Sequence, residues 1–279
     1  MKQRHRIILN ILDFLIDSKL VYFIHRIISY VILKIQNYTL EIKNDHNEKY
    51  KLLNELKKHH KTFLKERKHS KMMKGLNLAF ICDGNRRWAK KQGISVINKK
   101  IERGLEKITE IIRFCYCRGI ESISFYVFAL RNFKRDTNEI DGIKKFIINN
   151  DFKEIPVRIK IYGDFEAFQD PKIKEKLIEL DKKTSERKFN DFFTLNFFLG
   201  YNSTECDKNV GNPNMWFDER VDILIRTSGE KRLSDFLVRN VASGTSVQFV
   251  TALWPEFTIS QLYLIVYKYK LEEKFLIKK

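Results

Sequence analysis

Histidine is absent from most of this chain, and that absence disfavours several kinds of catalytic site. All six histidines of the 279 residues lie before Ser70. A Ser-His-Asp or Cys-His hydrolase and a histidine-ligated metal are therefore not expected in the remaining three quarters of the chain. Chemistry there has to use carboxylates, arginines, hydroxyl groups and a metal ion held by carboxylates.

Cysteine is also scarce. The four cysteines are too few for a disulfide framework in a chain of this size. Cys115 and Cys117 are close in sequence, but no matching pair follows, so a zinc site is not expected. This usage is typical of a chain whose thiols stay reduced in contact with the cytosol.

Long hydrophobic runs are missing as well. The longest uncharged apolar run, residues 27–33, is far below the roughly 20 residues that a membrane-spanning helix needs. Residues 7–42 are apolar with scattered charges, which predicts one or two amphipathic helices on a membrane surface or a partner. Packing on the protein's own domain is an open alternative. We expect residues 1–75 to form an amphipathic, basic helical extension without a secretory signal.

Negative charge is in short supply. The chain has 53 Lys and Arg against 35 Asp and Glu, a formal net charge of +18. Such an excess indicates an anionic partner, which could be a phosphorylated substrate, a membrane surface or nucleic acid, or it reflects only a lysine-rich surface. Neither GxGxxG nor GxxxxGK[ST] occurs, which disfavours a dinucleotide-binding fold and a P-loop.

From residue 78 onward, apolar strands alternate with amphipathic helices. Strands are predicted over residues 78–82, 122–128, 157–162, 193–198 and 221–225, and helices over residues 100–118, 139–149 and 171–187. This order predicts an α/β domain over residues 76–279, with a largely parallel central β-sheet flanked by helices. Because ligands bind at the carboxyl ends of parallel strands, Asp83, Asn132 and Arg226 are expected to meet at one edge.

Residues 78–91 carry the most informative pattern. An apolar strand ends at Asp83, Gly84 and Asn85 allow a sharp turn, and Arg86 and Arg87 open the next helix. A carboxylate can hold a hard cation such as Mg²⁺, while arginine forks and a helix start can hold phosphate oxygens. The pattern suits a metal-bound diphosphate, although an ordinary turn is the alternative.

Residues 222–236 repeat the arrangement. A short apolar strand runs into Arg226, which is followed by Ser228, Gly229, Arg232 and Ser234. Surface ion pairing explains one arginine easily, but not an arginine directly after an apolar strand. Two phosphate-binding strand ends in one chain indicate an enzyme that holds two phosphorylated substrates.

These residues resemble the cis-prenyltransferase family, which includes undecaprenyl and dehydrodolichyl diphosphate synthases. The resemblance runs from about residue 75 to about residue 257. In its last block the chain is similar to the eukaryotic dehydrodolichyl diphosphate synthases. Its blocks occur in the expected order, at residues 83–88, 125–135, 157–164, 195–201 and 225–236, closed by residues 253–257.

The resemblance implies an enzyme that extends farnesyl diphosphate with isopentenyl diphosphate units, using Mg²⁺, to a long polyprenyl diphosphate for dolichol synthesis and protein glycosylation. It implies that Asp83 and Asn85 are catalytic and that Asp83 holds the metal. The substrate-binding residues that it implies are Gly84, Arg86, Arg87, Trp88, Asn132, Phe133, Arg135, Arg226, Arg232 and Ser234. Candidates for an apolar tunnel around the growing chain are Phe128, Phe146, Phe165, Phe168 and Leu177, each of which is also a plausible core residue.

The chain departs from the family in two places that bear on activity. About twenty residues, 202–221, stand where the family has a further helix and loop. The Arg-x-Gly motif that ends single-subunit members is absent from residues 274–279. In eukaryotic complexes a Nogo-B-receptor-like subunit supplies that motif, so the resemblance implies a dimer, as a heteromer with such a subunit, peripherally attached to the cytosolic face of the endoplasmic reticulum.

Two other interpretations stay open. The chain could be a weak or silent subunit of a cis-prenyltransferase complex, which Asp83 argues against because silent subunits tend to lose it. The net charge alone also suggests a nucleic-acid-binding protein. That class interleaves basic residues with stacking aromatics, whereas here the arginines cluster at strand ends beside a carboxylate.

Overall fold

The structure is a computed structural model, and it describes residues 72–95, 97–134, 140–144, 157–185, 193–206 and 212–275. The predicted extension over residues 1–75 lies outside the described residues, except for its last four. Of the helix predicted over residues 139–149, residues 140–144 are described, and they are helical.

The described part of the chain is built on a six-stranded sheet in the order β3-β4-β2-β1-β5-β6. Every neighbouring pair is parallel, so the predicted fold class is confirmed. The strands are β1 (Asn77–Ile81), β2 (Ser122–Ala129), β3 (Arg158–Tyr162), β4 (Thr194–Tyr201), β5 (Ile223–Arg226) and β6 (Ser246–Phe249). The sequence analysis missed β6, because this edge strand is only partly buried and carries no continuous apolar run.

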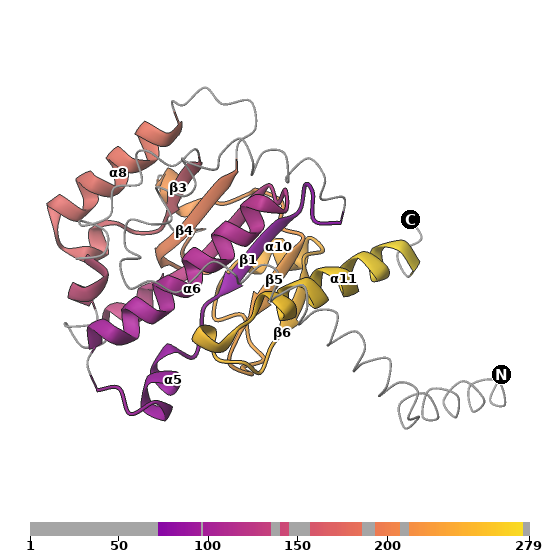
Figure 1. Ribbon diagram of the computed structural model, residues 1–279. Coiled ribbons are helices and arrows are strands. Elements are labelled where there is room, and N and C mark those ends of the chain that lie inside the picture. Colours follow the sequence, from indigo (N-terminus) through magenta and orange to yellow (C-terminus); the bar gives the residue numbers. More distant parts are fainter. Residues whose placement is uncertain are drawn as a thin grey trace. The chain divides into compact units, whose positions relative to one another are not determined.

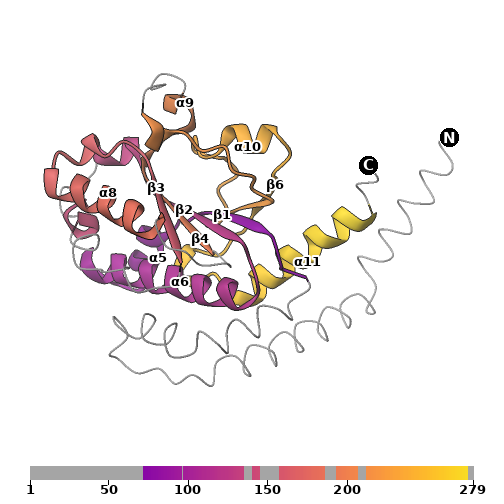
Figure 2. The ribbon, with the colours of Figure 1, turned by 90° about the horizontal axis from the view of Figure 1, so that it is seen from above.

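Helices cover both faces of the sheet. They are α5 (Asn85–Lys91), α6 (Ile97–Cys117), α8 (Pro171–Ser185), α9 (Ser203–Cys206), α10 (Val238–Ala242) and α11 (Ile259–Phe275). Figures 1 and 2 show α6, α8 and α11 on one face and α9 and α10 on the other. Helix α11 was not predicted, because its apolar residues do not form a single face. None of the helices in the described ranges is long and apolar enough to cross a membrane.

Strand β1 shows why the central strands read as continuous apolar runs. Leu78 and Phe80 pack in the core beneath α6 and α11, whereas Ala79 and Ile81 belong to the separate core on the opposite face. A strand covered on both faces needs apolar residues at every position. This burial places the polar ends of the strands, and not their faces, in reach of ligands.

The chain between β4 and β5 is short for the distance it crosses. It passes two intervening strands, β2 and β1, and within the described residues its only helices are α9 and the single turn Pro213–Met215. Aromatic side chains cover this face in place of a long helix: the Phe217 ring lies 5.0 Å from Tyr162 and 5.1 Å from Phe198. The described residues of this segment around Phe217 are therefore closely packed against the sheet.

Candidate active site

Asp83 lies in the tight connection between β1 and α5. Gly84, with φ +107, makes the turn possible: a Cβ there would lie 2.9 Å from Leu253 Cδ2 and 3.1 Å from Leu253 Cα. Only glycine combines this backbone conformation with so close an approach. The Trp254 amide donates to the Asp83 carbonyl at 3.0 Å, which holds the turn against the segment before α11.

Arg226, at the end of the neighbouring strand β5, faces Asp83 directly. Its Nη2 donates to Asp83 Oδ2 at 2.8 Å, and its Nη1 donates to Ser234 Oγ at 2.7 Å and to the Arg232 carbonyl. The side chain is only 3% exposed. A guanidinium buried to this degree requires partners on several sides. These contacts supply them at both terminal nitrogens, whereas the buried Nε has no hydrogen-bond partner among the described residues.

The same contact decides the charge of Asp83. Partial burial by itself would raise the pKa of the carboxyl, but the hydrogen bond and the positive charge of Arg226 outweigh it. The Ser228 hydroxyl and the Gly84 amide act in the same direction, and the pKa ends below its ordinary value. Asp83 is therefore an ionised oxygen donor at neutral pH.

Two more arginines lie on the solvent-exposed side of the Asp83–Arg226 pair. Arg87 is half exposed, donates to the Ser228 carbonyl at 3.1 Å and lies 3.8 Å from Asp83 Oδ1. Arg232 is still more exposed and pairs with Glu230 at 3.1 Å, and Glu230 also lies 3.6 Å from Arg87. Exposed pairs of this kind contribute roughly 0–1 kcal/mol, so an incoming phosphate can replace Glu230 at little cost.

Glu230 is a site residue that the sequence analysis did not assign. It lies inside the second phosphate-binding stretch, and its carboxylate bridges Arg87 and Arg232 from two different strand ends. The sequence signal was an acid between cations, which is common on any protein surface.

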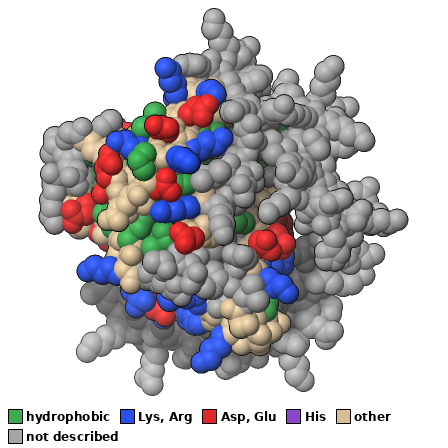
Figure 3. All heavy atoms as spheres, turned by 90° about the vertical axis from the view of Figure 1, so that its left-hand side faces the viewer, with side chains coloured by type: hydrophobic (Ala, Val, Ile, Leu, Met, Phe, Trp, Pro, Cys, Tyr) green, Lys and Arg blue, Asp and Glu red, His purple; other side chains and the backbone are tan. Residues whose placement is uncertain are grey.

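Figure 3, viewed from the side on which α5 and α8 lie in Figure 1, shows basic and acidic side chains intermixed around an apolar patch.

Asn85, the first residue of α5, points into the protein. Its Nδ2 donates to the Cys82 carbonyl at 3.0 Å, and its buried Oδ1 has no hydrogen-bond partner among the residues that the structure describes. Gly104 of α6 lies against that oxygen.

Burial raises the pKa of the Cys82 thiol well above its ordinary value, as does the Asp83 charge, so the thiol stays protonated. Farther along α5, Arg86 is exposed and Trp88 is partly buried.

The remaining predicted substrate-binding residues follow β2. Asn132 and Phe133 lie in a 3₁₀ turn, Leu130–Lys134, at the same edge of the sheet as Asp83, and both are partly buried. The Phe133 ring lies 4.9 Å from Phe128 and 4.9 Å from Phe168, which makes it part of an aromatic cluster. Arg135 lies outside the described residues, as does the tunnel candidate Phe146.

The other tunnel candidates are buried in the core on the α8 side of the sheet. They are Phe128, Phe165, Phe168 and Leu177. Close packing is a sufficient explanation for each of them, so their positions alone do not identify a substrate channel.

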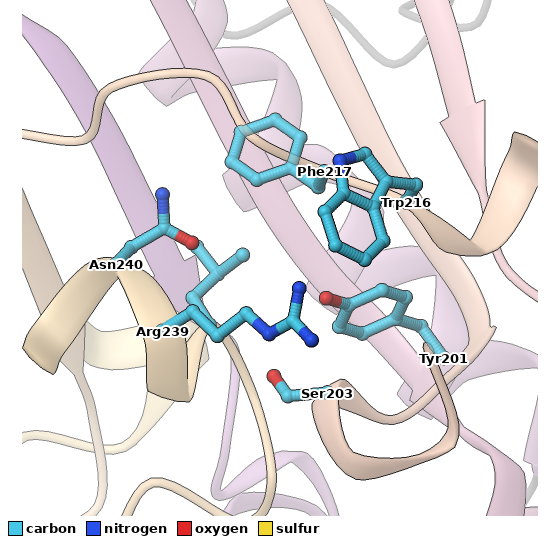
Figure 4. A pocket seen from close by; sticks show the side chains of 7 residues that line it. Tyr201, Ser203, Trp216, Phe217, Arg239 and Asn240 are labelled. Atoms are coloured by element: carbon cyan, nitrogen blue, oxygen red, sulfur yellow. The ribbon is translucent and has the colours of Figure 1, made fainter. Parts of the chain in front are cut away.

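A separate small hollow lies on the face that carries α10, and none of the predicted site residues lines it. Its lining includes Tyr201, Ser203, Trp216 and Arg239. Figure 4 shows the Arg239 guanidinium extending toward the Trp216 and Tyr201 rings, and it lies 4.4 Å from the Trp216 ring centroid. Arg239 is thus a lining residue that is already engaged with Trp216, and we assign this hollow no part in the chemistry of the edge site.

Comparisons with known proteins identify the family of the chain. Residues 81–276 match the family described as "Putative undecaprenyl diphosphate synthase". The chain is 43% identical over 211 residues to a dehydrodolichyl diphosphate synthase of Encephalitozoon cuniculi, covering 74% of each protein. It is 31% identical over 233 residues to the Homo sapiens dehydrodolichyl diphosphate synthase complex subunit DHDDS, covering 72% of this chain and 68% of the human protein.

A solved structure has the same fold. It is the lavandulyl diphosphate synthase of Lavandula x intermedia in complex with dimethylallyl diphosphate, with a TM-score of 0.56. The similarity covers 70% of this chain and 94% of that one, at 19% sequence identity. At this identity the likeness bears on architecture alone.

Proposed function

The chain belongs to the undecaprenyl diphosphate synthase family, and we propose that the edge site around Asp83 and Arg226 carries out its prenyl transfer. The reaction condenses isopentenyl diphosphate units onto an allylic diphosphate, farnesyl diphosphate. Its product is a long-chain polyprenyl diphosphate of the dehydrodolichyl type, for dolichol synthesis and protein glycosylation. The observation that carries the proposal is the 2.8 Å contact between a carboxylate and a buried guanidinium from two adjacent strand ends.

In each condensation the allylic C–O bond breaks and the diphosphate leaves with the electron pair. The allylic carbon then bonds to the terminal alkene carbon of isopentenyl diphosphate, and a proton is lost. Arg87 and the first turn of α5 are positioned to hold the departing diphosphate beside Asp83, and Asn85 and Trp88 belong to the same turn. Arg232 and Ser234, supported by Arg226, would hold the second diphosphate. Arg135, which lies outside the described residues, is assigned to the same diphosphate from its place in the sequence alone.

A divalent cation fits the donor set. Asp83 Oδ2 accepts from Arg226 at 2.8 Å, whereas Oδ1 lies 3.8 Å from Arg87 Nη2, beyond hydrogen-bond distance of that nitrogen. Among the described residues no three His, Cys, Asp or Glu side chains come together. Mg²⁺ needs no such cluster, because one carboxylate with substrate phosphates and water satisfies it. Asp83 would hold Mg²⁺, which when bound neutralises charge that develops on the leaving diphosphate.

The names of the relatives support a multi-subunit enzyme. The Homo sapiens relative is named as a complex subunit, and so is the Schizosaccharomyces pombe relative. The chain acts as a dimer, in a heteromer with a Nogo-B-receptor-like subunit, and attaches peripherally to the cytosolic face of the endoplasmic reticulum. The lipid nature of the product and the net charge of +18 both favour that location.

The test is incorporation of radiolabelled isopentenyl diphosphate into long polyprenyl product, with farnesyl diphosphate and Mg²⁺, for the chain alone and with a Nogo-B-receptor-like partner. Asp83→Asn keeps the shape of the side chain and removes its charge. We expect product with the partner and a loss of at least a hundredfold in turnover in Asp83→Asn.

Asp218→Asn is the matched control, because Asp218 is an exposed carboxylate in the loop before β5 and should leave turnover unchanged. Absence of product from the folded wild-type complex would favour a silent subunit. Equal turnover in the wild type and Asp83→Asn would contradict the site.

A further inference from the structure

Thr227, the residue after Arg226, makes an unusual set of contacts with Asp83. Its side chain is fully buried. Its Oγ1 accepts a hydrogen bond from the Asp83 amide at 3.0 Å and donates to the Asp83 carbonyl at 2.7 Å. One hydroxyl therefore satisfies both backbone polar groups of a residue 144 positions away.

These contacts continue the sheet beyond the point where its ladder ends. The pairing of β1 with β5 stops at Ile81 and Arg226, and the Thr227 amide adds one more bond to the Ile81 carbonyl at 3.3 Å. Cys82 and Asp83 have left the strand, so hydrogen bonds outside the ladder fix their backbone direction. At Asp83 two of these are backbone bonds, from its amide to the Ile81 carbonyl at 2.9 Å and from the Trp254 amide to its carbonyl at 3.0 Å, and the Thr227 hydroxyl adds two more.

Asp83 is consequently held from three directions. The Thr227 hydroxyl holds its amide and carbonyl, the Trp254 amide holds its carbonyl, and Arg226 holds one carboxylate oxygen. With the backbone held, rotation of the side chain is the main freedom left, and Arg226 restricts that rotation. The second carboxylate oxygen, Oδ1, is therefore fixed in one orientation, in which it faces the space beside Arg87.

We propose that Thr227 is a positioning residue for Asp83, whose hydroxyl sets the direction in which the carboxylate meets a cation and a diphosphate. The proposal rests on the proposed function of the edge site. Thr227 does not touch the substrates, so its loss acts through Asp83. Loss of the Thr227 hydroxyl should weaken metal-dependent binding of the allylic diphosphate, beyond any effect that it has on folding.

Thr184 provides a matched control elsewhere in the fold. It is also fully buried, and its Oγ1 accepts from the Ile159 amide at 2.9 Å and donates to the Ile159 carbonyl at 2.9 Å. It lies on α8 beside the start of β3, away from the carboxyl edge of the sheet. Replacing either threonine by valine removes an equivalent pair of backbone hydrogen bonds and keeps the side-chain volume.

The experiment measures binding of farnesyl thiodiphosphate, an unreactive analogue, by calorimetry with and without Mg²⁺, using the full chain with its partner subunit. Urea unfolding is followed in parallel. We expect Thr227→Val to weaken Mg²⁺-dependent binding about tenfold, and Thr227→Ser to stay within about twofold of the wild type. Thr184→Val should lose similar stability yet bind the analogue normally. If Thr227→Val does not fold, Thr227→Cys, with its weaker hydrogen-bonding thiol, takes its place with the same expectation.

Normal Mg²⁺-dependent binding by Thr227→Val, with only a loss of stability like that of Thr184→Val, would overturn the positioning role and leave the proposed function intact. Failure of Thr227→Ser to restore binding would also overturn it. A folded wild-type complex that does not bind the analogue with Mg²⁺ would contradict the proposed function itself, and the role of Thr227 with it.

Discussion

At the residue scale, Arg226 has two roles that its burial makes inseparable. It keeps Asp83 ionised, and it orders the loop that carries Arg232 and Ser234 through bonds to that loop's carbonyl and hydroxyl. A lysine at this position would keep the charge but lose the fork that reaches both partners at once. One side chain thus joins the two strand ends that we propose bind phosphate.

This dual role predicts a change in the pH dependence of the site. In the wild type the pKa of Asp83 lies below its ordinary value of 3.8. The ionised carboxylate therefore contributes to the stability of the fold above pH 3.8. That contribution is lost as the pH falls through the lower pKa that Asp83 has in the folded protein. Arg226→Gln removes the positive charge that lowers the pKa of Asp83, so burial then raises that pKa. The pH below which Mg²⁺-dependent binding of farnesyl thiodiphosphate is lost should therefore move to a higher value.

Calorimetric binding of farnesyl thiodiphosphate between about pH 3 and pH 8 checks this shift. We expect affinity at neutral pH to fall at least tenfold, with the acid midpoint raised relative to the wild type. Arg103→Gln is the control, since Arg103 forms an exposed pair with Glu106 on α6. An unchanged acid midpoint in Arg226→Gln would mean that Arg226 does not govern the charge of Asp83.

At the scale of elements, the junction of α5 and α6 positions the residues that we propose hold the first diphosphate. Asn85 fills the space where a side chain of Gly104 would be, since a Cβ on Gly104 would lie 2.7 Å from Asn85 Oδ1. The Gly104 carbonyl also accepts a hydrogen bond from Trp254 Nε1 at 2.9 Å. Helix α6 is thereby tied to the first turn of α5 and to the segment that holds Asp83.

Gly104→Ala tests that junction. In a helix interior this change usually stabilises a protein by roughly 0.5–1 kcal/mol. Here the close contact should reverse the sign, because the new methyl group pushes Asn85 away from the Cys82 carbonyl. We expect lower stability in urea and about tenfold weaker analogue binding. Glu102→Ala, at an exposed position of α6, should change neither, and a stabilised Gly104→Ala with normal binding would refute the argument.

At the scale of the whole molecule, the excess of positive charge predicts how the chain meets its lipid surroundings. A net charge of +18 attracts anionic surfaces over a distance set by salt, about 10 Å at 0.1 M and about 3 Å at 1 M. The full chain should therefore float with phosphatidylserine-containing vesicles at low salt and be released at about 1 M NaCl.

Vesicles of phosphatidylcholine alone are the control for this flotation measurement. Binding to both kinds of vesicle with no effect of salt would indicate apolar insertion, with no electrostatic contribution. Absence of binding to either would contradict the peripheral membrane attachment.

Much of the architecture could be read along the chain, because its signals are local. Strands β1 and β2 are apolar at nearly every position, and each ends where a polar cluster begins. Parallel strands that alternate with helices present those clusters at one edge, so Asp83 and Arg226 could be expected near each other from sequence alone. Edge strand β6 and helix α11 could not, because neither has the periodicity that identifies an element.

The contacts that give the site its chemistry are not local. Asp83 and Arg226 are 143 positions apart, and the carboxylate is ionised because the fold brings a buried guanidinium within 2.8 Å of it. Glu230, Thr227 and Gly104 looked like ordinary surface, strand-end and helix residues until their neighbours were known. Residue types and their order along the chain therefore indicate which groups meet at the edge. Distances, burial and hydrogen-bond partners depend on packing between segments far apart in sequence, so they emerge only in the folded protein.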